Sequence, residues 1–329
     1  MIATGAIAKI TRGILLLELS SAALVGLAFA TLKDTPSGLA ALYGLAFVLL
    51  VRLIITANNF IVAWCYGSET PPAHRLTNAQ ACALFAGEFR ATLWSSSWAL
   101  PFKSVRQFHA APDKMRPGSL PVLLVHGWGC NSGYWKPMSR ALARANISHR
   151  AVSLEPVLAD IDQYVSTIHT AVEELCSETG SQSVVIVGHS MGGLATRAYL
   201  RKYGRARVAQ LVTLGSPHHG TVLANFGRGA NSRQMHLHGG APSAWLQQLN
   251  AEESAEVRAR IVSVYSHHDN IIAPQTSSHL PGARNIEYRG IGHVALGLHP
   301  LVHARVIAEV RSASAPANNE SRHSMQNSS

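Results

Sequence analysis

The first 66 residues contain two long apolar stretches separated by a short polar turn. The stretch from Ile14 to Leu32 has Glu18 as its one charged residue, and the stretch from Gly38 to Trp64 has Arg52. Each is long enough to supply the roughly 20 apolar residues that span a bilayer. Because only residues 33–37 connect them, the pattern predicts an antiparallel hairpin of two transmembrane helices over residues 1–66.

The charged residues inside the two apolar stretches are placed symmetrically about the turn. Glu18 lies 14 residues before Leu32, and Arg52 lies 13 residues after Leu39. Because both helices rise about 1.5 Å per residue, the two side chains fall at a similar depth. A charge at that depth is costly and usually faces a partner. We therefore expect an ion pair across the hairpin. The alternatives are that each side chain snorkels separately or faces an oligomer interface.

The N-terminal stretch also has features of a signal peptide. Lys9 and Arg12 form a basic segment, and residues 28–30 read Ala-Phe-Ala, which resembles a cleavage site. The charge inside the first apolar stretch, and the second apolar stretch after it, favour a hairpin that is retained. With Arg75 and Arg90 following the second stretch, the positive-inside rule predicts that both ends face the cytoplasm. A cleaved signal peptide over residues 1–30 would instead give a secreted or periplasmic protein.

Residues 67–117 form a connector. It opens with a segment that contains two prolines and breaks regular structure, and residues 77–98 are then predicted to be helical. Trp94 and Trp98 would lie either at a membrane interface or against the following domain, and the pattern allows both.

Residues 118–312 alternate between short apolar segments and helical segments. This alternation is typical of an α/β fold, a mostly parallel sheet with helices on both faces. The polar tail of residues 313–329 is predicted to be disordered. The predicted strands cover residues 120–125, 149–154, 183–187, 207–214, 261–265 and 285–288, and the predicted helices cover residues 135–145, 160–177, 194–203 and 301–310.

The strand at residues 183–187 leads into a G-x-S-x-G pattern, Gly188-His189-Ser190-Met191-Gly192, and a helix follows at once. Strand, sharp turn and helix are the context of a nucleophile elbow, which exposes a serine hydroxyl at the edge of the sheet. Glycines two residues before and after the serine leave room for the tight turn. The sequence therefore predicts Ser190 as a nucleophile.

A serine hydroxyl needs a base to remove its proton, and the base is usually a histidine oriented by a carboxylate. Asp269 is the only aspartate after Ser190, and it follows the end of a predicted strand. The glutamates at positions 252, 253 and 256 lie in a charged stretch that is expected to face solvent. Asp269 is therefore the predicted acid.

His293 is the predicted base because it follows the next strand and lies beside Gly292. The chain order Ser190, Asp269, His293 is the one expected for this architecture. The other candidate histidines lie too close to Asp269, in a loop, or at the last helix; they are His267, His268, His279, His299 and His303.

Two backbone amides are predicted to stabilise a developing oxyanion. Met191 follows the nucleophile, and Trp128 lies in the glycine-containing loop after the strand at residues 120–125. Losing one such donor typically costs about 2.7–4 kcal/mol in the chemical step. His126 and His189, which flank these positions, are expected to be structural.

Composition narrows the possible partners. The chain has 329 residues, of which 14% are charged, a formal net charge of +10 and a pI of about 9.8. Its basic residues are scattered, which argues against nucleic acid and is consistent with a membrane surface. Four cysteines lie far apart without zinc-type spacing, so we expect neither a metal site nor a disulfide framework.

Five segments within residues 120–310 together resemble the α/β-hydrolase superfamily, and more narrowly bacterial triacylglycerol lipases and esterases. The resemblance implies hydrolysis of carboxylic esters through an acyl-enzyme, without a cofactor. Several members of the group bind structural calcium through aspartates, and this chain has only Asp269 to offer after its nucleophile. The segments are V-H-G-W-G at 125–129, G-H-S-M-G-G at 188–193, L-G-S-P-H-H-G-T at 214–221, S-H-H-D-N-I-I-A-P at 266–274 and G-H at 292–293.

We therefore expect a membrane-anchored serine hydrolase of lipase or esterase type, held in a bacterial inner membrane. Its expected partners are an acyl-ester or lipid substrate and the membrane, with no nucleic acid and with the oligomeric state left open. One alternative is a thioesterase or amidase that uses the same residues, and another is a non-catalytic domain that binds a lipid or a partner. Residues 222–249 contain four glycines and could cover the site.

Overall fold

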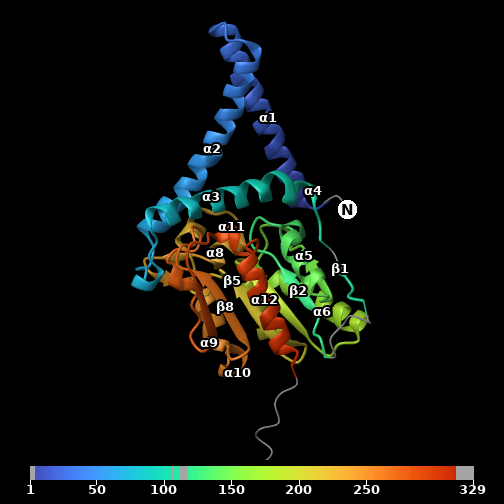
Figure 1. Cartoon of the computed structure of the whole chain (residues 1–329). Coiled ribbons are helices and arrows are strands. Elements are labelled where there is room, and N and C mark those ends of the chain that lie inside the picture. The colour runs from blue at the N-terminus through green and yellow to red at the C-terminus, as the bar shows by residue number, and fades with distance from the viewer. Residues whose placement is uncertain (1–3, 106, 112–117, 316–329) are drawn as a thin grey trace, which may run out of the picture.

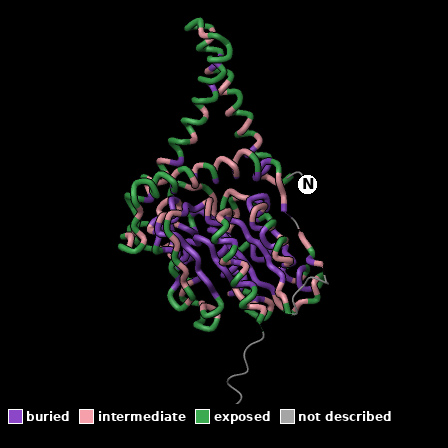
Figure 2. The backbone as a smooth tube through the Cα atoms, viewed as in Figure 1, coloured by how far each residue is buried: buried purple, intermediate pink, exposed green. Residues whose placement is uncertain are grey.

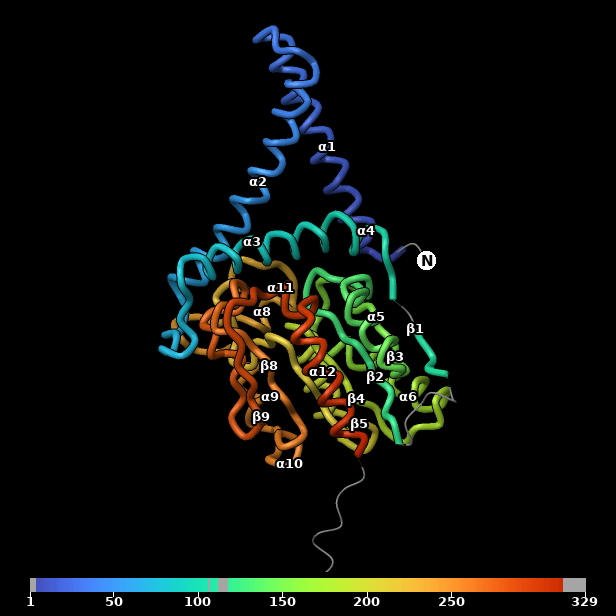
Figure 3. Tube along the Cα trace, in the orientation of Figure 1, coloured from blue at the N-terminus to red at the C-terminus, as the bar shows by residue number. Residues whose placement is uncertain are grey.

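The computed structural model describes residues 4–105, 107–111 and 118–315. Two long helices stand on an α/β domain, meet at a tip far from it, and spread apart toward it (Figure 1). A further helix, α3, crosses the top of the domain between the bases of these two helices (Figure 3). The predicted tail of residues 313–329 lies almost wholly outside the described residues.

The two long helices are α1 (Ala6–Leu32) and α2 (Ser37–Cys65), and each is long and apolar enough to cross a membrane. They approach closely at Gly44, where an added Cβ would lie 2.0 Å from the carbonyl oxygen of Ala22. Most of their large apolar side chains point outward and are exposed. Such a surface is favourable against lipid and unfavourable against water.

The predicted ion pair across the hairpin is formed. Arg52 Nε donates to Oε1 of Glu18 at 2.9 Å, and Arg52 Nη2 donates to Oε2 at 2.5 Å. The third guanidinium nitrogen, Nη1, donates to Oγ of Ser96 at 2.8 Å. The pair therefore joins the two helices to each other and to the connector.

The connector helix α3 (Asn78–Trp94) begins at Thr77, whose side chain and backbone form a capping box with Gln80. The helix predicted over residues 77–98 does not continue as a regular α-helix. After Trp94 it becomes a π-helical turn, η2 (Ser95–Ala99), followed by the short helix α4 (Leu100–Phe102). Single π-turns of this kind are frequent at functional sites.

The α/β domain contains a seven-stranded sheet with the order β1-β3-β2-β4-β5-β8-β9. All neighbouring strands are parallel except the edge strand β1, which pairs antiparallel with β3. The strands are β1 (Gln107–Phe108), β2 (Val122–Val125), β3 (His149–Val152), β4 (Val184–His189), β5 (Val208–Leu214), β8 (Ile261–Ser266) and β9 (Arg284–Tyr288).

Two hydrophobic cores lie on opposite faces of this sheet, and the strands are buried between them (Figure 2). Alternate residues of β2 point to opposite cores, with Leu123 in one and Leu124 in the other. This mostly parallel sheet with helices on both faces confirms the predicted fold class. One core packs α6 (Tyr164–Thr179) and α7 (Met191–Tyr203), and the other packs α5 (Lys136–Arg144) and α12 (Pro300–Ala313).

Short elements fill the connections of the α/β domain, and one, η1, lies in the connector. The periodic pattern of the sequence does not predict them; all except α9, which has nine residues, have five residues or fewer and so show no period. They are α8 (Ala230–Gln234), β6 (Leu237–His238), β7 (Ala241–Pro242), α9 (Ala244–Glu252), α10 (Ala255–Arg258), α11 (His293–Leu296) and the 3₁₀ turns η1 (Pro72–His74), η4 (Ser132–Trp135), η5 (Ile161–Gln163), η6 (Val222–Phe226) and η7 (Gln275–Ser278).

Candidate active site

Ser190 lies between the end of β4 and the start of α7, with φ 55° and ψ −127°. A positive φ at a non-glycine residue typically costs about 1–3 kcal/mol and persists only where the surroundings enforce it. The surroundings here are tight, because an added Cβ on Gly188 would lie 2.6 Å from the amide nitrogen of Gly193. An added Cβ on Gly192 would lie 2.3 Å from the carbonyl oxygen of Val125. The two flanking glycines therefore allow the turn that holds Ser190.

His293 and Asp269 form a buried pair. His293 Nδ1 donates to Oδ2 of Asp269 at 2.8 Å, and the amide of His293 donates to Oδ1 of Asn270 at 3.0 Å. The other oxygen of Asp269, Oδ1, accepts the amides of Ile271 and Ile272, both at 2.8 Å. These bonds fix the carboxylate, which in turn fixes the tautomer and the plane of the imidazole.

The surroundings of His293 favour its protonated form. Burial alone would lower the pKa of His293, and it is the largest single influence. The negative charge of Asp269, its hydrogen bond to the imidazole and the charge of Glu88 together outweigh burial, so the pKa of His293 lies above its ordinary value. An imidazole in such a site can accept a proton and be stabilised as an imidazolium.

Ser190 and His293 line one cavity of about 320 Å³, together with Trp128 and His189. The rest of the lining is mainly apolar. Two regions outside the central sheet also line the cavity. The connector contributes Thr92, Ser95, Ser96 and Leu100. Residues 222–249, which are predicted to cover the site, contribute Leu223, Ala224, Gly227, Ser232 and Met235.

The two predicted oxyanion donors both lie beside Ser190. Met191 is the first residue of α7, so its N–H belongs to the first turn, where amides have no acceptor within the helix. The loop that contains Trp128 approaches from β2. At Gly127 in this loop, an added Cβ would lie 2.8 Å from Cβ of Ser190. The backbone there is close enough to contact a group bound to the serine.

His126 and His189 have structural hydrogen bonds. His126 Nε2 accepts the amide of Leu154 at 3.0 Å, and burial lowers the pKa of His126 to about 4. His189 Nε2 donates to the carbonyl oxygen of His293 at 3.0 Å, and burial lowers the pKa of His189 well below its usual value. Both imidazoles are therefore neutral near pH 7, and His189 holds the backbone of His293.

Glu88 is a residue of this site that the sequence does not predict. It lies on α3 in the connector, it is buried, and its two oxygens accept the amides of Val294 and Ala295, both at 2.9 Å. These are the first amides after His293, so Glu88 caps the short helix that begins at this histidine. Burial raises the pKa of Glu88, while the two amide bonds and the charge of His293 oppose that rise.

The carboxyl group of Glu88 lies close to the backbone of Gly292. An added Cβ at Gly292 would lie 2.5 Å from Oε2 of Glu88. The glycine beside the predicted base therefore makes room for the carboxyl group of the connector. The only sequence signal for this contact is a single glutamate in the helical segment, and such a residue is usually solvent-facing.

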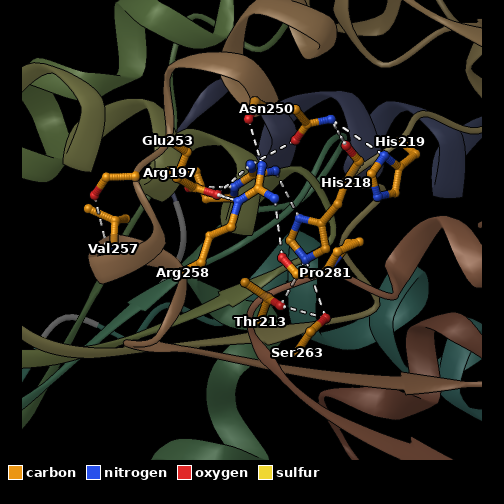
Figure 4. A network of polar contacts seen from close by, with 11 residues as sticks. Arg197, Thr213, His218, His219, Asn250, Glu253, Val257, Arg258, Ser263 and Pro281 are labelled. Carbon is orange, nitrogen blue, oxygen red and sulfur yellow. Dashed lines mark hydrogen bonds and ion pairs between the residues drawn. The ribbon is translucent and has the colours of Figure 1, made fainter.

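A second buried polar network lies between α7 and α9 (Figure 4). Arg197 is fully buried; its Nε and Nη2 donate to the two oxygens of Glu253 at 2.9 and 2.8 Å, and Nη2 also donates to Oδ1 of Asn250 at 2.8 Å. The expectation that Glu253 faces solvent is therefore wrong. Its partner is 56 residues away in the chain, and charge patterning along the sequence could not show the pair.

One of the two histidines of this network, His218, lies apart from the cavity. His218 Nε2 is 3.2 Å from Oγ1 of Thr213 and 3.3 Å from Oγ of Ser263. Burial lowers the pKa of His218 well below its usual value, and the nearby charge of Arg197 lowers it further. His218 does not line the cavity that contains Ser190. The network therefore stabilises the loop after β5, and His218 is not an alternative base for Ser190.

Comparison with known proteins gives a consistent assignment. A model of the palmitoyl protein thioesterase family matches residues 121–251. A triacylglycerol lipase from Burkholderia plantarii is 38% identical over 124 residues, which cover 35% of this chain and 34% of the relative. A triacylglycerol lipase from Pseudarthrobacter phenanthrenivorans is 38% identical over 114 residues, or 32% of this chain and 35% of the relative. The matches thus span about a third of the length of these curated relatives.

Among solved structures, the mature form of the Bacillus licheniformis lipase BlEst2 superposes with a TM-score of 0.55 at 15% identity. The match covers 63% of this chain and 99% of that protein. At this identity the likeness establishes the fold. Taken with the family and sequence matches, the chain has an α/β-hydrolase fold and resembles bacterial lipases and esterases.

Proposed function

We propose that this protein is a membrane-anchored serine hydrolase that cleaves carboxylic esters of acyl groups. Ser190 is the nucleophile, His293 the general base and Asp269 the carboxylate that orients the base. The observation that carries the proposal is the buried pair of His293 and Asp269, at 2.8 Å. His293 lines a cavity that is also lined by Ser190, which lies on a strained turn. The resemblance to lipases and esterases supports the same reaction class.

The proposed reaction has two steps. In the first, His293 removes the Oγ proton of Ser190, and Oγ attacks the ester carbonyl. The amides of Trp128 and Met191 stabilise the negative oxygen that forms, and the imidazolium then protonates the alcohol as it leaves. In the second step, His293 removes a proton from water, which attacks the acyl-enzyme; the bond to Oγ of Ser190 then breaks, Oγ takes the proton back from His293, and the acid is released.

The cavity and the hairpin favour an acyl chain with a lipid origin. The cavity lining is mainly apolar, and apolar residues such as Leu223, Met235 and Ile272 surround the space in front of the serine. The connector that closes the cavity also joins the two apolar helices to the domain. We propose that the hairpin holds the enzyme in a membrane, at its substrate, with both ends of the hairpin on the cytoplasmic side.

A thioesterase is the second candidate, and one observation favours it. The family model that matches residues 121–251 is that of palmitoyl protein thioesterases. The same nucleophile, base and apolar cavity would serve an acyl thioester, because the acyl-enzyme is identical for both substrates. The distinction rests on the leaving group.

The test combines active-site labelling with a substrate panel. We expect the wild-type protein to react with a fluorophosphonate probe, and Ser190→Ala to lose labelling completely. Ser166→Ala, which changes an exposed serine on α6, is the matched control and should label like the wild type. Labelling of Ser190→Ala at the wild-type level would disprove the assignment of the nucleophile.

The panel compares p-nitrophenyl esters of increasing chain length with acyl-CoA. For an acyl-ester hydrolase with an apolar cavity, we expect kcat/KM to rise with chain length up to the capacity of the cavity. A clear preference for the thioester at equal chain length would select the thioesterase. Equal kcat/KM for all esters would count against a lipid substrate.

A further inference from the structure

A cluster of two histidines and a glutamate lies outside the cavity that contains Ser190. His74 ends the turn η1 in the connector, His267 follows β8, and Glu287 lies on β9. His267 Nε2 is 2.8 Å from Oε2 of Glu287, and His74 Nε2 is 3.3 Å from the same oxygen. Each residue offers one metal-binding atom, and the three atoms lie within 4.8 Å of one another.

Contacts around the cluster orient its members. The hydroxyl of Tyr265 donates to Oε1 of Glu287 at 2.9 Å, which leaves Oε2 facing both imidazoles. Arg289 Nη1 donates to the carbonyl oxygen of Ala73 at 3.2 Å and so fixes the backbone just before His74. A hydrogen bond to the second oxygen of a ligating carboxylate is a common feature of metal sites. The Glu287 carboxylate and the backbone just before His74 are thus held in place before any ion binds.

Both imidazole nitrogens face a single carboxylate oxygen, Oε2 of Glu287. A divalent cation among the three atoms would be bound by all of them. Two imidazoles and one carboxylate, with water as a fourth ligand, form a set that binds Zn²⁺, whereas Ca²⁺ and Mg²⁺ prefer oxygen ligands. The side chains of His74 and Glu287 are 23% and 39% exposed, so solvent reaches the site. We propose that His74, His267 and Glu287 bind one Zn²⁺ ion.

The ion would fasten the connector to the catalytic domain. Its ligands come from η1, which follows the hairpin, and from the ends of two neighbouring parallel strands, β8 and β9. His267 also lies two residues before Asp269, so the ion would stiffen the loop that carries the predicted acid. This role is structural, because none of the three ligands lines the cavity. It differs from the expectation of no metal site, which rested on sequence spacing alone.

The test measures Zn²⁺ binding directly and does not depend on the proposed activity. The full-length protein in detergent is stripped with a chelator and dialysed, and Zn²⁺ is then titrated in competition with a chromophoric chelator. We expect one bound equivalent and a higher melting temperature with Zn²⁺ than without it. Substitution with Co²⁺ should give the intense visible absorption of a four-coordinate site.

Substitutions of the proposed ligands test whether these residues bind the ion. We expect His74→Ala and Glu287→Gln each to lower the Zn²⁺ affinity by on the order of 10–100-fold or more, since even outer-shell changes have effects of that size. His238→Ala, which removes an exposed histidine on β6, is the matched control and should bind as the wild type does. Circular dichroism without metal shows whether each variant folds.

Two results would overturn the proposal. One is a wild-type protein that takes up no Zn²⁺ or gives the weak spectrum of hexa-aqua Co²⁺, and this outcome is independent of how the variants fold. The other is a set of folded variants, His74→Ala and Glu287→Gln, that bind Zn²⁺ with the wild-type affinity.

Discussion

At the scale of single residues, the candidate site depends on groups whose environment is set by burial. Asp269 is 2% exposed and receives three hydrogen bonds, two of them from backbone amides. Its charge is therefore fixed beside His293 and raises the pKa of this histidine against the effect of burial. Burial likewise keeps His126 and His189 neutral, because no carboxylate among the residues that the structure describes raises the pKa of either imidazole.

The pH dependence of the reaction should show that the charge of Asp269 outweighs the effect of burial on the pKa of His293. His293 accepts a proton only when it is neutral, so kcat/KM should fall as the pH decreases through its pKa, which lies above the ordinary value of about 6.5. In Asp269→Asn the raising influences of charge and hydrogen bond are lost and burial prevails. We expect the acidic limb to move to lower pH and kcat to fall by about 10⁴-fold.

The measurement is a pH–rate profile of ester hydrolysis for both proteins. Asp162→Asn serves as the control, because Asp162 is 44% exposed in its side chain and pairs with Arg201, and neither residue lines the cavity. An acidic limb that stays in place in Asp269→Asn would show that another group titrates.

At the scale of elements, the connector forms part of the site. Helix α3 places Glu88 against the first turn of α11, and the π-helical turn after it places Ser95 and Ser96 in the cavity wall. The capping carboxyl group is favourably placed at the positive end of this short helix. The predicted domain bounds at residues 67–117 and 118–312 stay predictions, but the cavity is built from both segments.

We expect Glu88→Gln to reduce kcat by on the order of 10-fold while KM changes little. The amide group keeps one acceptor and presents a donor to the second backbone N–H, which leaves a buried amide unsatisfied at a typical cost of about 1–3 kcal/mol. It also removes a charge that raises the pKa of His293. The acidic limb of the pH–rate profile should therefore move to lower pH, as in Asp269→Asn but by less.

A shift of the acidic limb in Glu88→Gln would show that Glu88 acts on His293. A general loss of folding would instead lower the activity at all pH values alike. Glu69→Gln changes an exposed glutamate of the same connector and should leave both kcat and the profile unchanged. A Glu88→Gln profile that overlays the wild type would rule out a role for this carboxyl group in the reaction.

At the scale of the whole molecule, hydrogen bonds join the hairpin to the connector and to the α/β domain. Arg12 Nε donates to the carbonyl oxygen of Pro101 at 2.9 Å, and the amide of Ala6 donates to Oε1 of Glu155 at 2.7 Å. Near the middle of the hairpin, Arg52 pairs with Glu18 and also with Ser96, which lines the cavity. The apolar helices and the reacting groups are therefore parts of one connected structure.

A charge exchange tests this connection. Glu18→Gln and Arg52→Gln each leave one charge without its partner in an apolar environment, at a cost of roughly 2.5–3.5 kcal/mol for a charge at the centre of a membrane helix. We expect both to lower the temperature at which the detergent-solubilised protein loses fluorophosphonate labelling. The double exchange, Glu18→Arg with Arg52→Glu, should recover most of this loss, though not the bond to Ser96.

The control for this series is Lys33→Gln, in the exposed turn of the hairpin, which should melt like the wild type. A double exchange that melts no higher than either single variant would mean that the pair does not stabilise the hairpin.

Local features of the sequence were sufficient to predict the fold class, the two apolar helices and the places of Ser190, Asp269 and His293 in the chain. Each of these depends on short-range physics: the period of apolar residues, the length of an apolar stretch, or the glycines that a tight turn requires. Glu18 and Arg52 could also be paired, because a hairpin with a short turn fixes which depths coincide.

Only the tertiary structure decided the contacts between distant parts of the chain. Glu88 reaches α11 across 206 residues, and Glu253 is buried by Arg197 across 56. His74 meets Glu287 only because η1 lies against β9. A single glutamate or histidine in a helix or loop has no local pattern that reveals its partner, since its energy depends on burial and on charges that the folded chain brings together.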